Sequence, residues 1–104
     1  MKSSDMPHPI ERIAKADPAT AQGFKNLRAA LNGGPIEYRT GELILLSGFI
    51  TLGYEEAVKI HACRLIEDGM TVAQVRQCAL FLLGATATMV QVSNAIKWID
   101  EVTS

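Results

Sequence analysis

Two residues of this chain, Glu42 and His61, carry the side chains best suited to proton transfer. Glu42 is the one charged residue between Thr40 and Tyr54, and His61 is the one histidine outside the N-terminal segment. A carboxyl group and an imidazole that meet in apolar surroundings form a candidate acid–base site. Tyr54 precedes His61 by about two helical turns and can present a hydroxyl on the same side. The sequence therefore predicts His61, Glu42 and Tyr54 as catalytic residues.

The same three residues also have a purely structural interpretation. A glutamate and a histidine on neighbouring helices often form a hydrogen bond that fixes how the helices pack, because buried polar groups need partners whether or not they catalyse. A tyrosine that opens an amphipathic helix is often a packing residue. The alternative to an enzyme is therefore a non-catalytic binding or assembly module with a structural Glu42–His61 pair.

No other group of residues indicates a reaction centre. One interior histidine with scattered acids does not supply the several ligands of a zinc or di-iron site, so we expect neither a metal nor a cofactor. Cys63 and Cys78 lie fifteen residues apart and are interpreted as two small, partly buried thiols. The glycines mark helix ends and do not form a phosphate-binding loop.

Length and charge narrow the function classes. The 104 residues, 48% hydrophobic and 20% charged, fit one globular domain with a core. A formal net charge of −1 provides no basic surface for nucleic acid or an anionic membrane, so the expected partners are a small-molecule ligand and further copies of the chain. The first ten residues lack the apolar stretch of a secretory signal, which favours a cytoplasmic location.

The spacing of apolar residues predicts an all-α bundle of about five helices. Residues 1–16 are expected to form a flexible arm or short helix, and residues 17–104 the helical domain. Asp17 before Pro18 is a good helix start, and Thr71 with Gln74 forms a capping box. Gly84 is placed inside the fourth helix, where it would permit close packing. The expected helices are 17–31, 37 or 40 to 52, 55–68, 71–87 and 89–102.

The segment from Gln77 to Ile96 has no charged residue and is about long enough to span a bilayer. It also contains Thr86, Thr88, Gln91, Ser93 and Asn94, which an isolated membrane helix would have to hide in lipid. We therefore interpret it as two buried helices or a contact between subunits.

Three short segments are similar to a known family. Gly41-Glu42-Leu43-Ile44 begins the apolar helix, Lys59-Ile60-His61 follows, and Gly69-Met70-Thr71 precedes the next helix. Over about residues 17 to 102 the chain resembles the carboxymuconolactone decarboxylase family, which includes the alkylhydroperoxidase D-like proteins. This resemblance implies an all-helical subunit that assembles into a ring, as a trimer or a hexamer, with a pocket near the second and third helices.

The resemblance also indicates which branch of the family is nearer. In the peroxidase-like branch a glutamate, a CxxC motif and a histidine form a proton relay. The same spacing places Glu42 and His61 at the ends of the relay and Tyr54 and Ala57 at the cysteine positions. A thiol peroxidase is therefore disfavoured. The resemblance implies a cofactor-independent lyase or isomerase that acts on a small organic acid or lactone.

Overall fold

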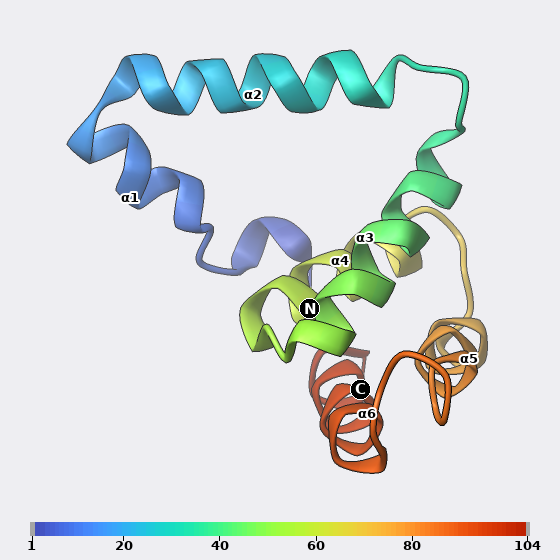
Figure 1. Cartoon of the computed structure of the whole chain (residues 1–104). Coiled ribbons are helices and arrows are strands. Elements are labelled where there is room, and N and C mark those ends of the chain that lie inside the picture. Colours follow the sequence, from blue (N-terminus) through green and yellow to red (C-terminus); the bar gives the residue numbers. More distant parts are fainter. Residues whose placement is uncertain (1, 104) are drawn as a thin grey trace.

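The computed structural model describes residues 2–103, and the regular secondary structure in this range is helical, with a single isolated β-bridge and no strand (Figure 1). The all-α prediction is confirmed, but there are six α-helices rather than five because the N-terminal segment contains a helix of its own. In order, the elements are the 3-10 helix η1 (Ser3–Asp5) and the α-helices α1 (Pro9–Ala16), α2 (Pro18–Asn32), α3 (Tyr38–Leu52), α4 (Glu55–Glu67), α5 (Val72–Phe81) and α6 (Met89–Thr103).

The core lies among α3, α4, α5 and α6. The α3 sequence is apolar on most sides, as expected of a central helix, and it packs against α4, which in turn packs against α6. Fully buried aliphatic side chains come from each of these helices, including Leu46, Ile50, Leu65, Val75 and Ile99. These four helices fix the backbone that carries the candidate site.

The short connection between α3 and α4 depends on glycine. Gly53 ends α3 in the left-handed conformation, with φ 75°, where an L side chain is strained. Tyr54 follows directly as the N-cap of α4, and the amides of Glu55 and Glu56 begin that helix. The tight turn places α4 alongside α3 and so sets the register between the two helices.

The end of α5 differs from the prediction. We expected this helix to continue to Ala87, but it ends at Phe81. The Leu82 carbonyl accepts hydrogen bonds from three successive amides, those of Ala85, Thr86 and Ala87. Gly84 stands in this loop with φ 76°, so it ends the helix and does not serve as a packing position within it.

The next helix begins with a cap that sequence analysis missed. The Thr88 amide donates to Oε1 of Gln91 at 2.8 Å, and the Gln91 amide donates to Oγ1 of Thr88 at 3.2 Å. Nε2 of Gln91 also donates to the Thr51 carbonyl at 2.7 Å, which joins the start of α6 to the end of α3. The predicted capping box at Thr71 and Gln74 is confirmed.

The helices α1 and α2 form an arm that stands away from the core (Figure 1). They pack against each other, and Ala21 is the one buried residue of α2. Before the arm, η1 is fixed to α4: the Ser3 amide and hydroxyl donate to the Glu67 carboxylate at 2.7 and 3.0 Å, and Met6 is buried. After the arm, α2 continues through residues 33–37 into α3. The arm is therefore held at both ends, and the expected domain division at residue 16 stays a prediction.

The uncharged segment from Gln77 to Ile96 contains the end of α5, the loop and the first half of α6. Val92 and Ala95 are buried, but a patch at this end of the molecule is exposed: Leu80, Phe81, Leu83, Met89 and Val90. Within residues 2–103 no helix combines the length and the apolar character needed to cross a membrane.

Candidate functional site

The helices α3 and α4 bring the two predicted acid–base residues together. Glu42 lies in the second turn of α3 and is 5% exposed, and His61 lies in the middle of α4. Nδ1 of His61 is in hydrogen-bonding contact with Oε2 of Glu42. The Gly53 turn therefore brings these two side chains, nineteen positions apart in sequence, into direct contact.

This contact leaves the other nitrogen of the imidazole available. An ionised Glu42 carboxylate can only accept, so Nδ1 carries a hydrogen, and in the neutral form of the imidazole Nε2 then presents its lone pair. The His61 side chain is 12% exposed. Among the residues that the structure describes, no buried side-chain nitrogen or oxygen lacks a hydrogen-bond partner, and Nδ1 carries the one hydrogen bond seen on this ring. Nε2 therefore reaches solvent, where it can accept a proton from a bound molecule.

Two further polar groups, Arg64 and Tyr38, lie near Glu42. The sequence indicates Arg64 only as one of several dispersed cations that could meet an anionic substrate, and Tyr38 is not expected at the site. Nη1 of Arg64 lies 3.8 Å from Oε1 of Glu42, and this side chain is 35% exposed. Arg64 follows His61 by three residues, so helical spacing could have placed it on the same face of α4. The pKa of Tyr38 is raised by burial and then by the negative charge of Glu42, so its phenol remains protonated and can donate.

The aromatic ring of Phe49 neighbours both His61 and Tyr54. The Phe49 ring centroid lies 5.0 Å from that of His61 and 6.2 Å from that of Tyr54. Tyr54 is 54% exposed, and no hydrogen bond joins it to His61 in the described part of the chain. Phe49 thus covers one face of the imidazole, and Tyr54 stands one ring further out.

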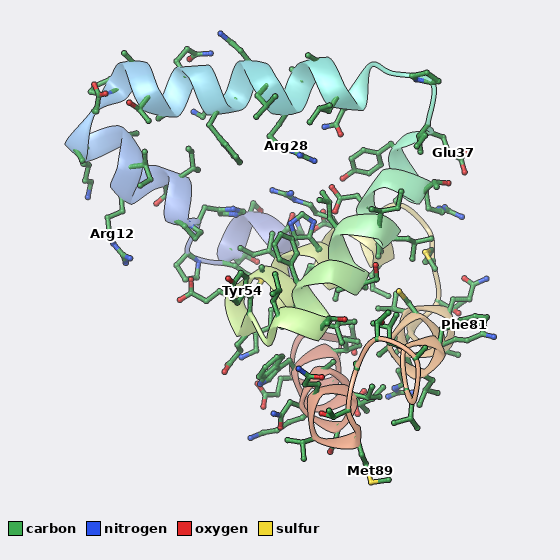
Figure 2. All side chains as sticks on the ribbon, viewed as in Figure 1. Arg12, Arg28, Glu37, Tyr54, Phe81 and Met89 are labelled. Atoms are coloured by element: carbon green, nitrogen blue, oxygen red, sulfur yellow. The ribbon has the colours of Figure 1, made fainter. Side chains whose placement is uncertain are left out.

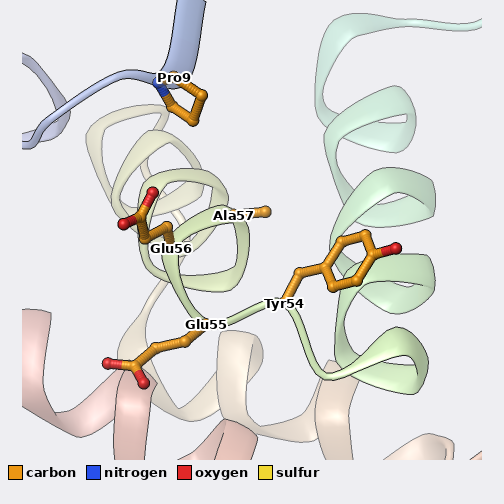
Figure 3. A pocket seen from close by; sticks show the side chains of 5 residues that line it. All are labelled: Pro9, Tyr54, Glu55, Glu56 and Ala57. Atoms are coloured by element: carbon orange, nitrogen blue, oxygen red, sulfur yellow. The ribbon is translucent and has the colours of Figure 1, made fainter. Parts of the chain in front are cut away.

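A hollow of about 530 Å³ adjoins the first turn of α4 and is lined by Pro9, Tyr54, Glu55, Glu56 and Ala57. Tyr54 and Ala57 project to one side of α4, and the two glutamates project to the other (Figure 3). Ala57 is one helical turn before His61, on the same face. Tyr54 and Ala57 therefore border a hollow large enough for a small organic molecule.

A second hollow, of about 350 Å³, lies at the other end of the pair and is lined by Glu37, Tyr38, Arg39 and Asp68. Neither hollow is lined by Glu42 or His61 themselves. Figure 2 shows Glu37 at the start of α3 and Tyr54 at the start of α4, so the two hollows open at separate places along these helices. The predicted pair lies between them.

The cysteines do not form a reactive centre. Cys63 is buried and Cys78 half-buried, both are free thiols, and burial raises the pKa of each. A raised pKa keeps a thiol protonated and poorly nucleophilic near neutral pH. In the described chain no three His, Cys, Asp or Glu residues come together as metal ligands would.

Comparison of the chain with models of protein families, with curated proteins and with solved structures gives no match. The family resemblance therefore stays a prediction from the three segments around Glu42, His61 and Thr71.

Proposed function

We propose that this protein is a cofactor-independent lyase or isomerase of the carboxymuconolactone decarboxylase-like kind, acting on a small organic acid or lactone in the cytoplasm. The observation that carries the proposal is the arrangement of the His61 ring, with Nδ1 on the buried Glu42 carboxylate and Nε2 open to solvent. This is the arrangement that a general base requires, because one nitrogen is oriented while the other meets the substrate.

In the proposed mechanism His61 takes a proton from the substrate at Nε2 and later returns it. Glu42 keeps the hydrogen on Nδ1 and stabilises the imidazolium that forms in between. Because the carboxylate is largely withdrawn from water, its attraction for the imidazolium is less screened than that of a surface carboxylate. Tyr54 borders the adjoining hollow, where its hydroxyl can donate to a developing oxyanion.

The position of Arg64 favours a substrate that carries a carboxylate group. Its guanidinium is partly exposed and lies 3.8 Å from Glu42, a distance at which the pair leaves donors free for a second carboxylate. A substrate carboxylate on Arg64 would place the rest of the molecule near Nε2 of the same helix face. We therefore assign Arg64 the role of a substrate anchor.

A binding or assembly module is the second candidate, and the burial of Glu42 favours it. A carboxylate that is 5% exposed needs a partner for the fold alone, and His61 supplies one. A peroxidase is the least supported function, because Tyr54 and Ala57 replace the cysteines and burial raises the pKa of both remaining thiols. For either candidate we propose self-association, as a trimer or a hexamer.

Turnover measured on a panel of small lactones and small carboxylic acids tests the enzyme proposal. General acid–base catalysis contributes about 100-fold or more, so His61→Asn should lower kcat by at least that factor. Arg64→Ala should raise KM for substrates with a free carboxylate and leave kcat nearly unchanged. Arg76→Ala, which removes an exposed arginine paired with Asp100 on another face, is the matched control and should change neither. Absence of any turnover, or full activity in His61→Asn, would refute the enzyme proposal.

A further inference from the structure

The arm has an apolar face that nothing in its own chain covers. Phe24, Leu27 and Leu31 recur at helical spacing along α2 and are 50%, 54% and 55% exposed. Apart from at most a marginal contact, α2 packs against α1 alone. A 15-residue helix is marginal in water without tertiary packing, and here its large side chains remain in solvent.

The accessible surface area of the chain is also larger than that of a typical folded monomer of the same mass. The accessible area is 6568 Å² for a chain of 11.3 kDa. A folded monomer of that mass has about 5700 Å². The excess of about 800–900 Å² equals one partner's share of a standard protein interface, which is about 800 Å². The radius of gyration, 14.1 Å, also exceeds the ~13 Å of a compact domain of this length.

A face of matching shape lies along the outside of α3. Ile44 is 54% exposed, and a Cβ built on Gly41 or on Gly48 would meet no atom within 4 Å. The order small, large, small at residues 41, 44 and 48 has the same spacing, three and then four residues, as Phe24, Leu27 and Leu31. Side chains on one helix can therefore seat beside the glycines of the other, as ridges enter grooves.

The α2 helix contains Lys25 and Arg28 and no acidic residue. Arg28 lies on the side of α2 that faces the rest of the molecule in Figure 2. In this structure α2 makes at most a marginal contact with α3 of its own chain.

We infer that the Phe24–Leu27–Leu31 face of α2 docks on the Gly41–Ile44–Gly48 face of α3 in a neighbouring copy of the same chain. This inference rests on the proposed self-association and names its contact surfaces. Because the donor and acceptor faces differ, each copy has one of each, and the contacts close as a reciprocal dimer or as a ring.

Light scattering coupled to size-exclusion chromatography tests the contact on the whole chain. The native protein should have a mass of at least twice 11.3 kDa. Leu27→Lys in the donor face and Gly48→Arg in the acceptor face should each reduce the mass to that of one chain. Gly48→Arg should still fold, because the added side chain begins in open space. The control Ala29→Lys lies on the opposite, exposed side of α2 and should leave the mass unchanged.

Mixing the two defective variants distinguishes this contact from others. Leu27→Lys keeps an intact acceptor face and Gly48→Arg an intact donor face, so together they should form a dimer that neither forms alone. A monomeric native protein would overturn the inference. It would also be overturned if Gly48→Arg kept the native mass, as in pairing of α2 with α2, or if only Phe81→Lys in the other exposed patch dissociated the assembly. None of these outcomes depends on turnover, so the enzyme proposal is tested separately.

Discussion

The coupling between Glu42 and His61 can be measured as a free energy of unfolding. Their side chains are 6% and 12% exposed, so the hydrogen bond between them forms largely out of water. A hydrogen bond that involves a charged group contributes about 1.5–3 kcal/mol. We therefore expect a double-mutant cycle of Glu42→Ala and His61→Ala to give a coupling energy of about 2 kcal/mol.

The two single variants should differ. His61→Ala leaves the Glu42 carboxylate buried with Arg64 3.8 Å away as its remaining partner, so we expect a loss near the lower end of ~3–5 kcal/mol. Glu42→Ala leaves an imidazole that can remain neutral and keeps Nε2 in solvent, so the loss should be about 2 kcal/mol. The order of the two losses, with His61→Ala the larger, follows from which group is left unpaired.

Urea unfolding followed by Trp98 fluorescence provides the assay, because Trp98 is the single tryptophan and packs against the core. All variants must be compared at one protein concentration, since self-association adds to apparent stability. The control cycle uses Arg76 and Asp100, whose side chains are each 45% exposed although their atoms approach to 2.7 Å. That pair should couple by about 0.2–1 kcal/mol. A Glu42–His61 coupling no larger than that of the control pair would refute the reasoning.

Two further predictions concern the backbone and the N-terminal anchor. Gly53→Ala should lower the free energy of unfolding by about 1 kcal/mol or more because of the positive φ, whereas Gly23→Ala within α2 should raise it by up to about 1 kcal/mol; equal effects in urea unfolding would contradict this. The Ser3 hydrogen bonds hold the pKa of Glu67 below its ordinary 4.5, so the stability they add is present above pH 4.5 and is lost as the pH falls through the lowered value. The protection factor of the Ser3 amide against hydrogen exchange, measured by NMR, should fall in acid and lose this pH dependence in Glu67→Gln; an equal protection factor across that range in the native protein would contradict the anchor.

Local signals were sufficient to predict the elements that hold the pair. The apolar run after Glu42 predicted a central helix, and α3 has Leu46 and Ile50 fully buried. Gly53 predicted the break, and its left-handed conformation is observed. With two adjacent helices joined by so short a turn, contact between Glu42 and His61 followed from helical geometry, and the hydrogen bond is present.

The sequence predictions differed from the structure where two local signals competed, or where packing between helices determined the position of a side chain. Residues 82–87 are rich in helix formers, so a helix to Ala87 was expected, but Gly84 and the Thr88–Gln91 cap together favour a stop and a new start. Thr88 followed three residues later by Gln91 is itself a sequence signal for a helix start at residue 89. Tyr54 and His61 both lie beside the Phe49 ring of α3, and spacing along α4 alone carries no information about a ring on another helix.

The uneven burial of the pair connects the two proposals. The chain itself encloses Glu42, but Nε2 of His61 remains at the surface, where water weakens every electrostatic contribution to catalysis. Gly41 directly precedes Glu42, so a helix seated on the α3 face would lie at the edge of this open side. If both proposals hold, the variant Leu27→Lys, which contacts neither residue of the pair, should lower kcat while it dissociates the assembly. Full activity in the dissociated variant would show instead that one copy of the chain is sufficient for the chemistry.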